Sequence, residues 1–428
     1  MPSSAPEQPD SSPAGTPAPG APPMLGDGIP PSVPPPASPS SLRRWLAVLL
    51  SLCLGLFLAD AVIGLADDSA AIFLGNHPLS VLRILVSLFA MLLAALVYVL
   101  MALTPAIPKR LFVPVALFYL TVALAGLPIT LLCQEHLTQI AWGISLVQVG
   151  LGIGLLALAR RGLKFGRPLV PLEQLGSRNF SWWNLAGFSL ANIFGLLPAV
   201  VLYLLLCVAG LVAHFTDGFM TLHPGGFQVQ VRKYVRADGK TIQLFPMSHV
   251  AEGDFYRDIA RTFPTNSLIL LEGVTDEKHL LQHKINYQRM AQSLGLAEQQ
   301  KQFEPTRGEK VAADVDVSQF TTNTLALLNL IISIHAGQWE AGTFQKLANY
   351  SAAPEAQTQL LDDLLQKRNQ HLLTEIQRHL LAANYLVVPW GVAHMPGLAR
   401  EIQKSGFHLT ETQDYMVIRF HGAGLARP

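Results

Sequence analysis

The chain has 428 residues, half of them hydrophobic and 14% charged, and its formal net charge is +1. Ordinary soluble proteins carry about 25% charged residues, so the composition argues against a wholly soluble protein. The near-neutral balance and the lack of a basic tract argue against a nucleic-acid partner. Cys53, Cys133 and Cys207 all fall inside apolar runs, which argues against a disulfide framework or a cysteine metal site.

The N-terminal segment, residues 1–41, is dominated by Pro, Ser, Ala and Gly. Such a segment cannot bury enough apolar surface to offset the entropy lost on ordering, so we predict that it is disordered. It does not resemble a signal peptide, because the first apolar stretch begins only after it.

Five hydrophobic stretches follow within residues 42–215, and each reaches the roughly 20 residues that a helix needs to cross a bilayer. They are about Trp45–Ile63, Ile84–Leu103, Leu111–Cys133, Leu137–Leu158 and Ala191–Ala213. Buried helices of a soluble domain rarely occur as five such stretches in succession. We therefore expect a region of five transmembrane helices inserted in the lipid bilayer.

Basic residues in the short loops predict the orientation, because loops rich in Lys and Arg stay in the cytoplasm. The N-terminal flank and the second and fourth loops carry Arg43, Arg44, Lys109, Arg110, Arg160, Arg161, Lys164 and Arg167. The other two loops carry Asp67, Asp68, Glu135 and His136, with only Arg83 against the trend. The N-terminus is thus predicted to be cytoplasmic and the C-terminal domain to lie outside the cytoplasm. The pattern would suit a bacterial inner membrane with the domain in the periplasm.

The predicted spans contain almost no ionisable residues. Asp60 lies near the outer end of the first span, where an interfacial position would explain it, and Pro198 could kink the last span. Transporters usually show polar groups or broken helices near the midplane. The sequence therefore favours a membrane anchor over a transporter with an accessory domain, which stays a third alternative.

Residues 220–421 are long enough for one α/β core. Predicted strands are GFQVQVRKYV and KTIQLFPM around a turn at Asp238-Gly239, then SLILLEGV and LVVPWGV, with FHLTE and DYMVIRF as a closing hairpin. Helical patterns cover about 276–294, 320–338 and 354–383. Strands at both ends that enclose helices predict a mixed sheet with helices packed around it.

Candidate chemistry lies where predicted strands end. His249, Glu272 and His394 each follow an apolar strand, and Arg368 lies in the long helix beside Asn369. Sites in α/β proteins form beyond the carboxyl ends of strands. Two imidazoles and a carboxylate could hold a divalent cation, which would support amide hydrolysis by lowering the pKa of a bound water. Arg368 could clamp a carboxylate or stabilise developing negative charge.

Structural alternatives stay open for each of these residues. A lone histidine at a strand end is commonly a hydrogen-bonded structural residue, Glu272 could cap a following helix, and Arg368 could lie on the surface. His279 and His283 have the i, i+4 spacing of a metal pair, but no glutamate motif accompanies them. We expect those two to lie on a solvated helix face. The same expectation covers His335, His371 and His379.

Four segments occur in an order that resembles the signature of the TraB/PrgY/GumN family, which includes the Tiki proteases and belongs with the erythromycin esterase-like and ChaN-like proteins. The segments are MSHVAEGDFYRDI, LILLEGVTDE, QKRNQHLL and VVPWGVAHMPGLAREIQKSG, and the resemblance covers about residues 225–420. It implies metal-dependent peptidase activity at a membrane surface, two Gly-x-x-His motifs, a glutamate and an arginine. By this resemblance the second motif is Gly391–His394, the acidic position is Glu272 and the basic one is Arg368.

The first motif departs from the family pattern, because Pro246 stands at its glycine position three residues before His249. Proline cannot adopt a positive φ and donates no N–H. If the family's glycine serves a left-handed turn, proline would alter the site. If it serves only close packing at the strand end, proline would be tolerated. The leading hypothesis is a hydrolase of peptides with His249, His394 and Glu272 as metal ligands, the last alternatively as general base. The alternative is a non-catalytic domain that binds a peptide or signal.

Overall fold

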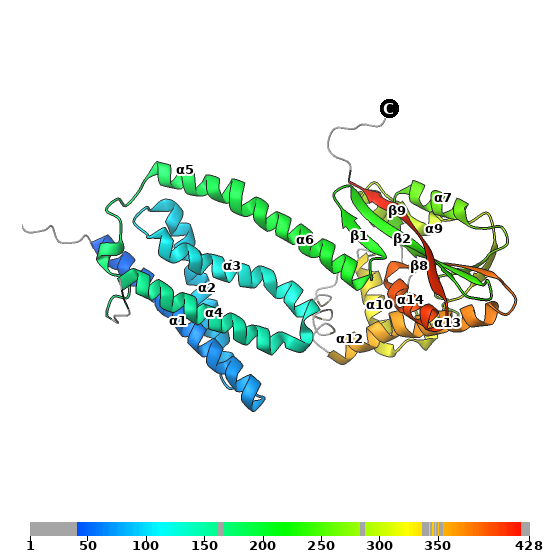
Figure 1. Cartoon of the computed structure of the whole chain (residues 1–428), viewed down its shortest axis with the longest axis horizontal. Coiled ribbons are helices and arrows are strands. Elements are labelled where there is room, and N and C mark those ends of the chain that lie inside the picture. Colours follow the sequence, from blue (N-terminus) through cyan, green and yellow to red (C-terminus); the bar gives the residue numbers. More distant parts are fainter. Residues whose placement is uncertain are drawn as a thin grey trace, which may run out of the picture.

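The computed structural model describes residues 41–160, 166–282, 287–335 and 354–420, with a few single residues between these ranges. The predicted disordered segment lies outside the described residues except for Ser41, which begins the first helix. A bundle of long helices forms the N-terminal part, and an α/β unit forms the C-terminal part (Figure 1).

Among the described residues, five helices are long and apolar enough to cross a membrane. The first four are α1 (Ser41–Leu74), α2 (Ser80–Leu103), α3 (Lys109–Leu132) and α4 (Leu137–Arg160). The fifth combines α5 (Trp182–Ala191), a π-helical turn (Asn192–Leu196) and α6 (Leu197–Phe215). Each contains one of the predicted apolar stretches, so the prediction of five long apolar helices is confirmed.

The centre of the bundle is apolar and closely packed. Helix α1 packs against α2 and α4, and Gly152 of α4 comes so near to Leu58 that an added Cβ would lie 2.5 Å from its side chain. Large buried side chains at this centre are Leu50, Leu54, Phe57, Met101, Phe112 and Leu156. The α5–α6 helix has no buried residue, so the rest of the chain leaves much of its apolar surface uncovered.

Asp60 lies inside this bundle, and its expected interfacial depth in a membrane stays a prediction. The residue is 5% exposed. Its carboxylate accepts hydrogen bonds from Tyr119 (2.9 Å) and Gln148 (2.8 Å), near the middle of α3 and α4, and from Ser87 of α2. Side-chain donors from three helices thus offset the desolvation of the carboxylate.

The C-terminal unit is built on a mixed sheet with the strand order β1-β2-β3-β8-β5-β7, and β9 pairs β2. The strands are β1 (Met220–His223), β2 (Gly226–Val235), β3 (Thr241–Met247), β5 (Leu268–Leu271), β7 (Glu309–Ala312), β8 (Tyr385–Gly391) and β9 (His408–Arg419). Strands β3, β8, β5 and β7 run parallel, and β1, β2 and β9 pair antiparallel. A separate short ladder joins β4 (Val250–Ala251) to β6 (Ala297–Glu298).

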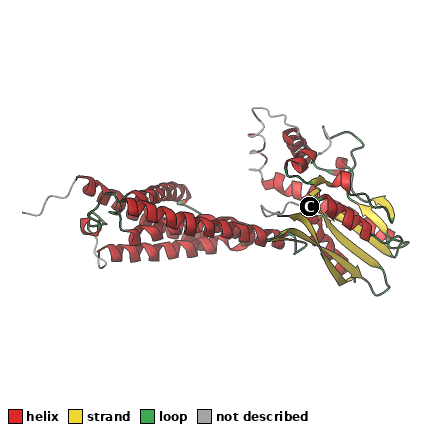
Figure 2. Cartoon of the chain, turned by 90° about the horizontal axis from the view of Figure 1, so that it is seen from above, coloured by secondary structure: helices red, strands yellow, loops and turns green. Residues whose placement is uncertain are grey.

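Helices cover both faces of this sheet (Figure 2). The bounds are α7 (Gly253–Thr262), α8 (Gln288–Ser293), α9 (Gln299–Gln302), α10 (Thr322–His335), α12 (Pro354–Leu361), a π-helical turn (Asp362–Lys367), α13 (Arg368–His379) and α14 (Met395–Lys404). Alternate residues of β8 point to opposite faces. Leu386 and Val388 pack in the cluster that contains α13 and α14, whereas Val387 packs with α7. The predicted mixed sheet with surrounding helices is confirmed.

The predicted closing hairpin was wrong. The two segments form one continuous strand, β9, which pairs with β2 along its length with two irregularities in register. Thr412 and Gln413, which separate the two predicted segments, lie opposite Arg232 and Val231 in this ladder. No glycine or proline interrupts the strand, so long-range pairing with β2 overrides the weak local turn signal.

The predicted helix at about 276–294 was also wrong in most of its length. Within the described part of that range, the only helix is α8. The carboxylate of Asp276 accepts hydrogen bonds from the backbone N–H groups of Leu280 (2.7 Å) and Leu281 (3.0 Å). His279 has φ +55°, which a continuing helix does not allow. The aspartate thus stabilises a loop instead of a helix.

Candidate functional site

The four parallel strands end at one edge of the sheet, and each is followed by a polar side chain. Met247 of β3 pairs with Gly391 of β8, and Leu271 of β5 pairs with Ala312 of β7. Because the carboxyl ends of parallel strands share an edge, the segments after them converge. The polar residues in these segments are His249, Glu272, Asp314 and His394.

Arg368 bridges two of these residues. Its Nη2 donates to Glu272 Oε1 (2.8 Å) and to Asp314 Oδ2 (2.6 Å), and its Nε donates to Asp314 Oδ1 (3.0 Å). Burial disfavours the charge of the guanidinium, but the hydrogen bonds to Asp314 and the charge of Glu272 raise the pKa of Arg368 above its ordinary value. The side chain is 12% exposed, so a surface position for Arg368 is contradicted.

Glu272 is held at both oxygens. Its Oε1 accepts from Arg368, and its Oε2 accepts the backbone N–H of Gly391 at 2.5 Å. A Cβ on Gly391 would lie 3.4 Å from Oε2, in van der Waals contact with the carboxylate. No helix begins in the described residues directly after Glu272, so it does not act as a helix cap.

His394 is 3% exposed and its ring is fixed on two sides. Its Nδ1 lies 2.8 Å from Asn369 Oδ1, and its ring meets Trp390 edge to face at 5.1 Å. Because the amide oxygen can only accept, Nδ1 carries the proton and the lone pair remains on Nε2. Burial lowers the pKa of His394 to about 4, so the ring is neutral near pH 7 and its Nε2 lone pair can bind a cation.

The π-helical turn Asp362–Lys367 directly precedes Arg368 and Asn369. Such turns shift the phase of the residues that follow and occur frequently at functional sites. Asp363 within it is fully buried and accepts hydrogen bonds from the backbone N–H (2.7 Å) and hydroxyl (2.8 Å) of Thr321. The turn is thereby fixed to the segment before α10, which sets the direction in which Arg368 and Asn369 point.

His249 lies at the exposed side of the same edge of the sheet. Its ring stacks on Tyr287 with centroids 4.8 Å apart and planes at 12°, and its Nδ1 lies 3.2 Å from Gln299 Oε1. It is near enough for its charge to contribute to the lowered pKa of His394. Within the part of the chain that the structure describes, however, the ligand atoms of His249, Glu272 and His394 do not all lie within 4.8 Å of one another.

Pro246 fits the fold without distortion. It lies in β3 opposite Trp390 of β8, and its φ is not positive, since among the described non-glycine residues only Asp217 and His279 have positive φ. The glycine position of the first motif therefore serves no left-handed turn in this chain. Proline is tolerated here because an extended strand end suits its fixed φ.

A divalent cation fits part of the site. His394 Nε2 lies 3.7 Å from Glu272 Oε1, and two ligands of one tetrahedral ion lie roughly 3.4 Å apart, given bonds of about 2.1 Å. Asn369 supplies the partner that metal-binding histidines normally have at their other ring nitrogen. His249 would have to move toward this pair to complete a three-ligand set.

Two residues of the site were missed in the sequence. Asp314 follows β7 just as Glu272 follows β5, but β7 is short and largely exposed, so its apolar pattern is weak. Tyr287 follows no motif, although burial and the charge of Glu272 raise its pKa, which places it near the carboxylate. A search for polar residues after every short apolar run would have found Asp314 but not Tyr287.

Of the other candidate histidines, those whose side chains the structure describes contribute nothing to this site. His279 is exposed in a loop, not on the expected helix face, and His283 lies outside the described residues, as does the side chain of His335. His379 pairs with Glu375 on α13 at 3.4 Å. His371 is half-buried on the same helix.

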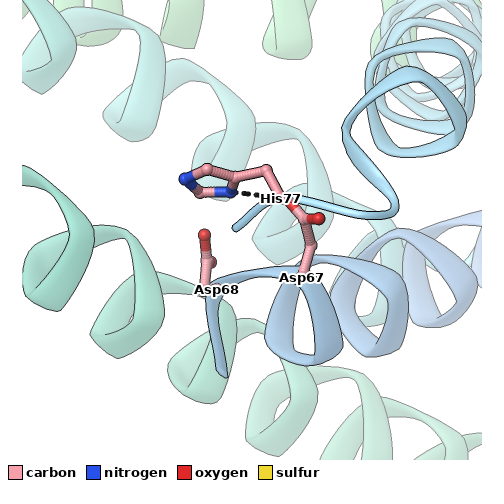
Figure 3. A group of neighbouring side chains, drawn as sticks. All are labelled: Asp67, Asp68 and His77. Carbon is pink, nitrogen blue, oxygen red and sulfur yellow. Dashed lines mark hydrogen bonds and ion pairs between the residues drawn. The ribbon is translucent and has the colours of Figure 1, made fainter. Parts of the chain in front are cut away.

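A second group of titratable residues lies in the helical bundle (Figure 3). Asp67, Asp68 and His77 offer ligand atoms within 4.8 Å of one another. Arg83 already contacts Asp68 and lies 3.7 Å from Asp67, and His77 Nδ1 lies 3.0 Å from Asp67. Both aspartates therefore already have partners within the chain, and the group joins α1 to the start of α2.

No family model, curated protein or solved structure matches this chain. The resemblance to the TraB/PrgY/GumN family therefore rests on the motifs alone and stays a prediction.

Proposed function

We propose that the chain is a membrane-anchored, metal-dependent hydrolase of peptides, with the C-terminal α/β unit outside the cytoplasm. The observation that carries the proposal is the pairing of His394 Nε2 with Glu272 Oε1, 3.7 Å apart at the carboxyl ends of parallel strands. The family resemblance of the surrounding motifs and the basic loops of the helical part support it.

His394 and Glu272 would hold a divalent cation together with His249. Such an ion supplies Lewis acidity, which polarises an amide carbonyl and activates water. Asn369 keeps the Nε2 lone pair of His394 directed at the site. Arg368 keeps its charge beside the carboxylates and would orient a substrate carboxylate or stabilise developing negative charge.

A non-catalytic binding domain is the second candidate. Both oxygens of Glu272 are already engaged, by Arg368 and by the N–H of Gly391, and the three proposed ligands are not preassembled. The site would then hold a peptide or signal molecule through Arg368 and the rings of His249 and Tyr287.

Metal analysis of the full chain, purified in detergent, separates the two candidates. The parent is expected to hold about one divalent ion per chain, and His394→Ala and Glu272→Gln are expected to lose it, because a remaining pair of ligands binds weakly. His408→Ala is the matched control, since His408 is exposed on β9, and it should keep the ion.

Cleavage of a peptide library by the same preparations tests hydrolysis. A metal-dependent hydrolase loses cleavage on chelation and in His394→Ala. Retained metal and cleavage in His394→Ala would exclude the proposed site. Tight peptide binding without turnover, unchanged by chelation, would favour the binding domain.

A further inference from the structure

The end of the helical bundle opposite the α/β unit contains an open pocket of about 380 Å³. It lies where α2 ends and α3 begins, beside the start of α5. Its lining includes Pro105, Pro108, Lys109, Arg110, Gln174 and Asn184.

The pocket is positively charged. Among the described residues that line it, two are basic and none is acidic. Lys109 Nζ donates to Asn184 Oδ1, and Arg110 Nη2 donates to Gln174 Oε1 (2.6 Å). These amide oxygens hold the two cations in place but carry no charge, so the positive charge of the pair is not compensated by them.

The two amides are themselves fixed by the helix ends around the pocket. Asn184 Nδ2 donates to the carbonyls of Met101 (2.9 Å) and Ala102 (2.8 Å) at the end of α2. Gln174 Nε2 donates to the carbonyl of Ala159 (2.7 Å) near the end of α4. Because their N–H groups are used in this way, the amide oxygens must face the basic side chains. The basic pair is therefore positioned by the fold.

The start of α3 adds to the attraction for an anion. Pro108 occupies the N-cap position and provides no side-chain cap. The N–H of Leu111 donates to the Pro108 carbonyl (2.9 Å), whereas the N–H groups of Lys109 and Arg110 lack the acceptor that a capping side chain would supply. The positive end of the α3 helix dipole also lies at the pocket and favours an anion there. Trp182 and Trp183, 73% and 89% exposed at the start of the neighbouring α5, suit the depth of lipid headgroups.

From these observations we infer that the pocket binds the phosphate of an anionic lipid headgroup. Basic pockets between membrane helices recognise such headgroups. The phosphate would lie between Lys109 and Arg110, near the N-terminus of α3, while the acyl chains would run along the exposed apolar surface of α5. This site is independent of the proposed hydrolase site, which lies beyond the other end of the bundle.

Native mass spectrometry of the delipidated full chain tests the site. The probes are dioleoylphosphatidylglycerol, dioleoylphosphatidylcholine and inorganic phosphate. We expect preferential binding of phosphatidylglycerol, weakened about fivefold by Arg110→Gln and roughly 25-fold by Lys109→Gln with Arg110→Gln, since each basic residue contributes a similar increment. Arg110 is exposed, so the single variant is expected to fold even if the double variant does not.

Arg44→Gln is the matched control. Arg44 is also an exposed basic residue at this end of the bundle, but it does not line the pocket, so its removal should leave the preference unchanged. Equal losses in Arg44→Gln and Arg110→Gln would overturn the proposal, because they would indicate unspecific attraction. Inorganic phosphate that binds as tightly as the lipid would overturn the lipid assignment. Equal binding of both lipids would also overturn it.

Discussion

At the scale of single residues, Arg368 determines the charge balance of the strand-end site. The Glu272 and Asp314 side chains that share it are 10% and 0% exposed. Replacing Arg368 by glutamine would leave two buried carboxylates without a cation. We expect Arg368→Gln to lower the free energy of unfolding of the α/β unit by about 3–5 kcal/mol, measured by denaturant unfolding of the full chain in detergent.

Arg378→Gln is the control for this prediction. Arg378 lies on the same helix, α13, but its side chain is 64% exposed, so its loss should change the stability by less than about 0.5 kcal/mol. The loss of stability in Arg368→Lys should lie between those of Arg368→Gln and Arg378→Gln. Lysine keeps the charge but cannot donate to both carboxylates in the geometry of a guanidinium. Equal losses for Arg368→Gln and Arg378→Gln would contradict the charge balance described here.

A residue of the site could be predicted only where a local sequence pattern marks its position. His249, Glu272 and His394 follow apolar runs, and strand ends in an α/β unit meet at one edge, so their approach to one another was predictable. Asn369 was visible beside Arg368, but its bond to His394 depends on the π-helical turn before it, which no local pattern indicates. Tyr287 reaches the site from a loop, and only the tertiary fold places it there.

At the scale of elements, the turn between β1 and β2 depends on Gly226. Its φ is +143°, and a Cβ would lie 1.9 Å from the carbonyl oxygen of Ile418 on β9. Both the backbone conformation and the close strand therefore exclude a side chain. We expect Gly226→Ala to destabilise the α/β unit by about 3 kcal/mol and to increase hydrogen exchange in β9.

The neighbouring glycine supplies the control for this turn. A Cβ on Gly225 would meet nothing within 4 Å, and this residue is not among the described glycines with positive φ. Gly225→Ala should therefore leave the stability and the exchange of β9 nearly unchanged. If both variants behave alike, the close approach of β9 at Ile418 is wrong.

Elements with strong periodic signals were predictable, and elements that depend on distant partners were not. The long apolar stretches and the strands β2, β3, β5 and β8 follow from residue patterns of their own. By contrast, β9 is continuous because β2 lies beside it, and the loop at Asp276 forms because one carboxylate satisfies two backbone N–H groups. Local propensity predicts secondary structure poorly where such tertiary contacts determine it.

At the scale of the whole molecule, polar contacts hold together a bundle that is otherwise apolar. Within a membrane, apolar side chains gain little by leaving lipid for one another, so hydrogen bonds and close packing carry helix association. Asp60 of α1 supplies such hydrogen bonds between helices. Its carboxylate accepts from Ser87 of α2, Tyr119 of α3 and Gln148 of α4. The sequence alone did not indicate this role, since the partners lie on separate helices.

The helical bundle should therefore be sensitive to the polar group at position 60. Asp60→Leu removes the acceptor and leaves three donors in apolar surroundings, whereas Asp60→Asn keeps one carbonyl oxygen for them. We expect Asp60→Leu to cost about 1–3 kcal/mol in unfolding by sodium dodecyl sulfate and Asp60→Asn clearly less, because unpaired buried donors carry most of the penalty. Val62→Ala, at a site 57% exposed on the same helix, should have little effect. Equal stability of Asp60→Leu and the parent would mean that packing alone holds the four helices together.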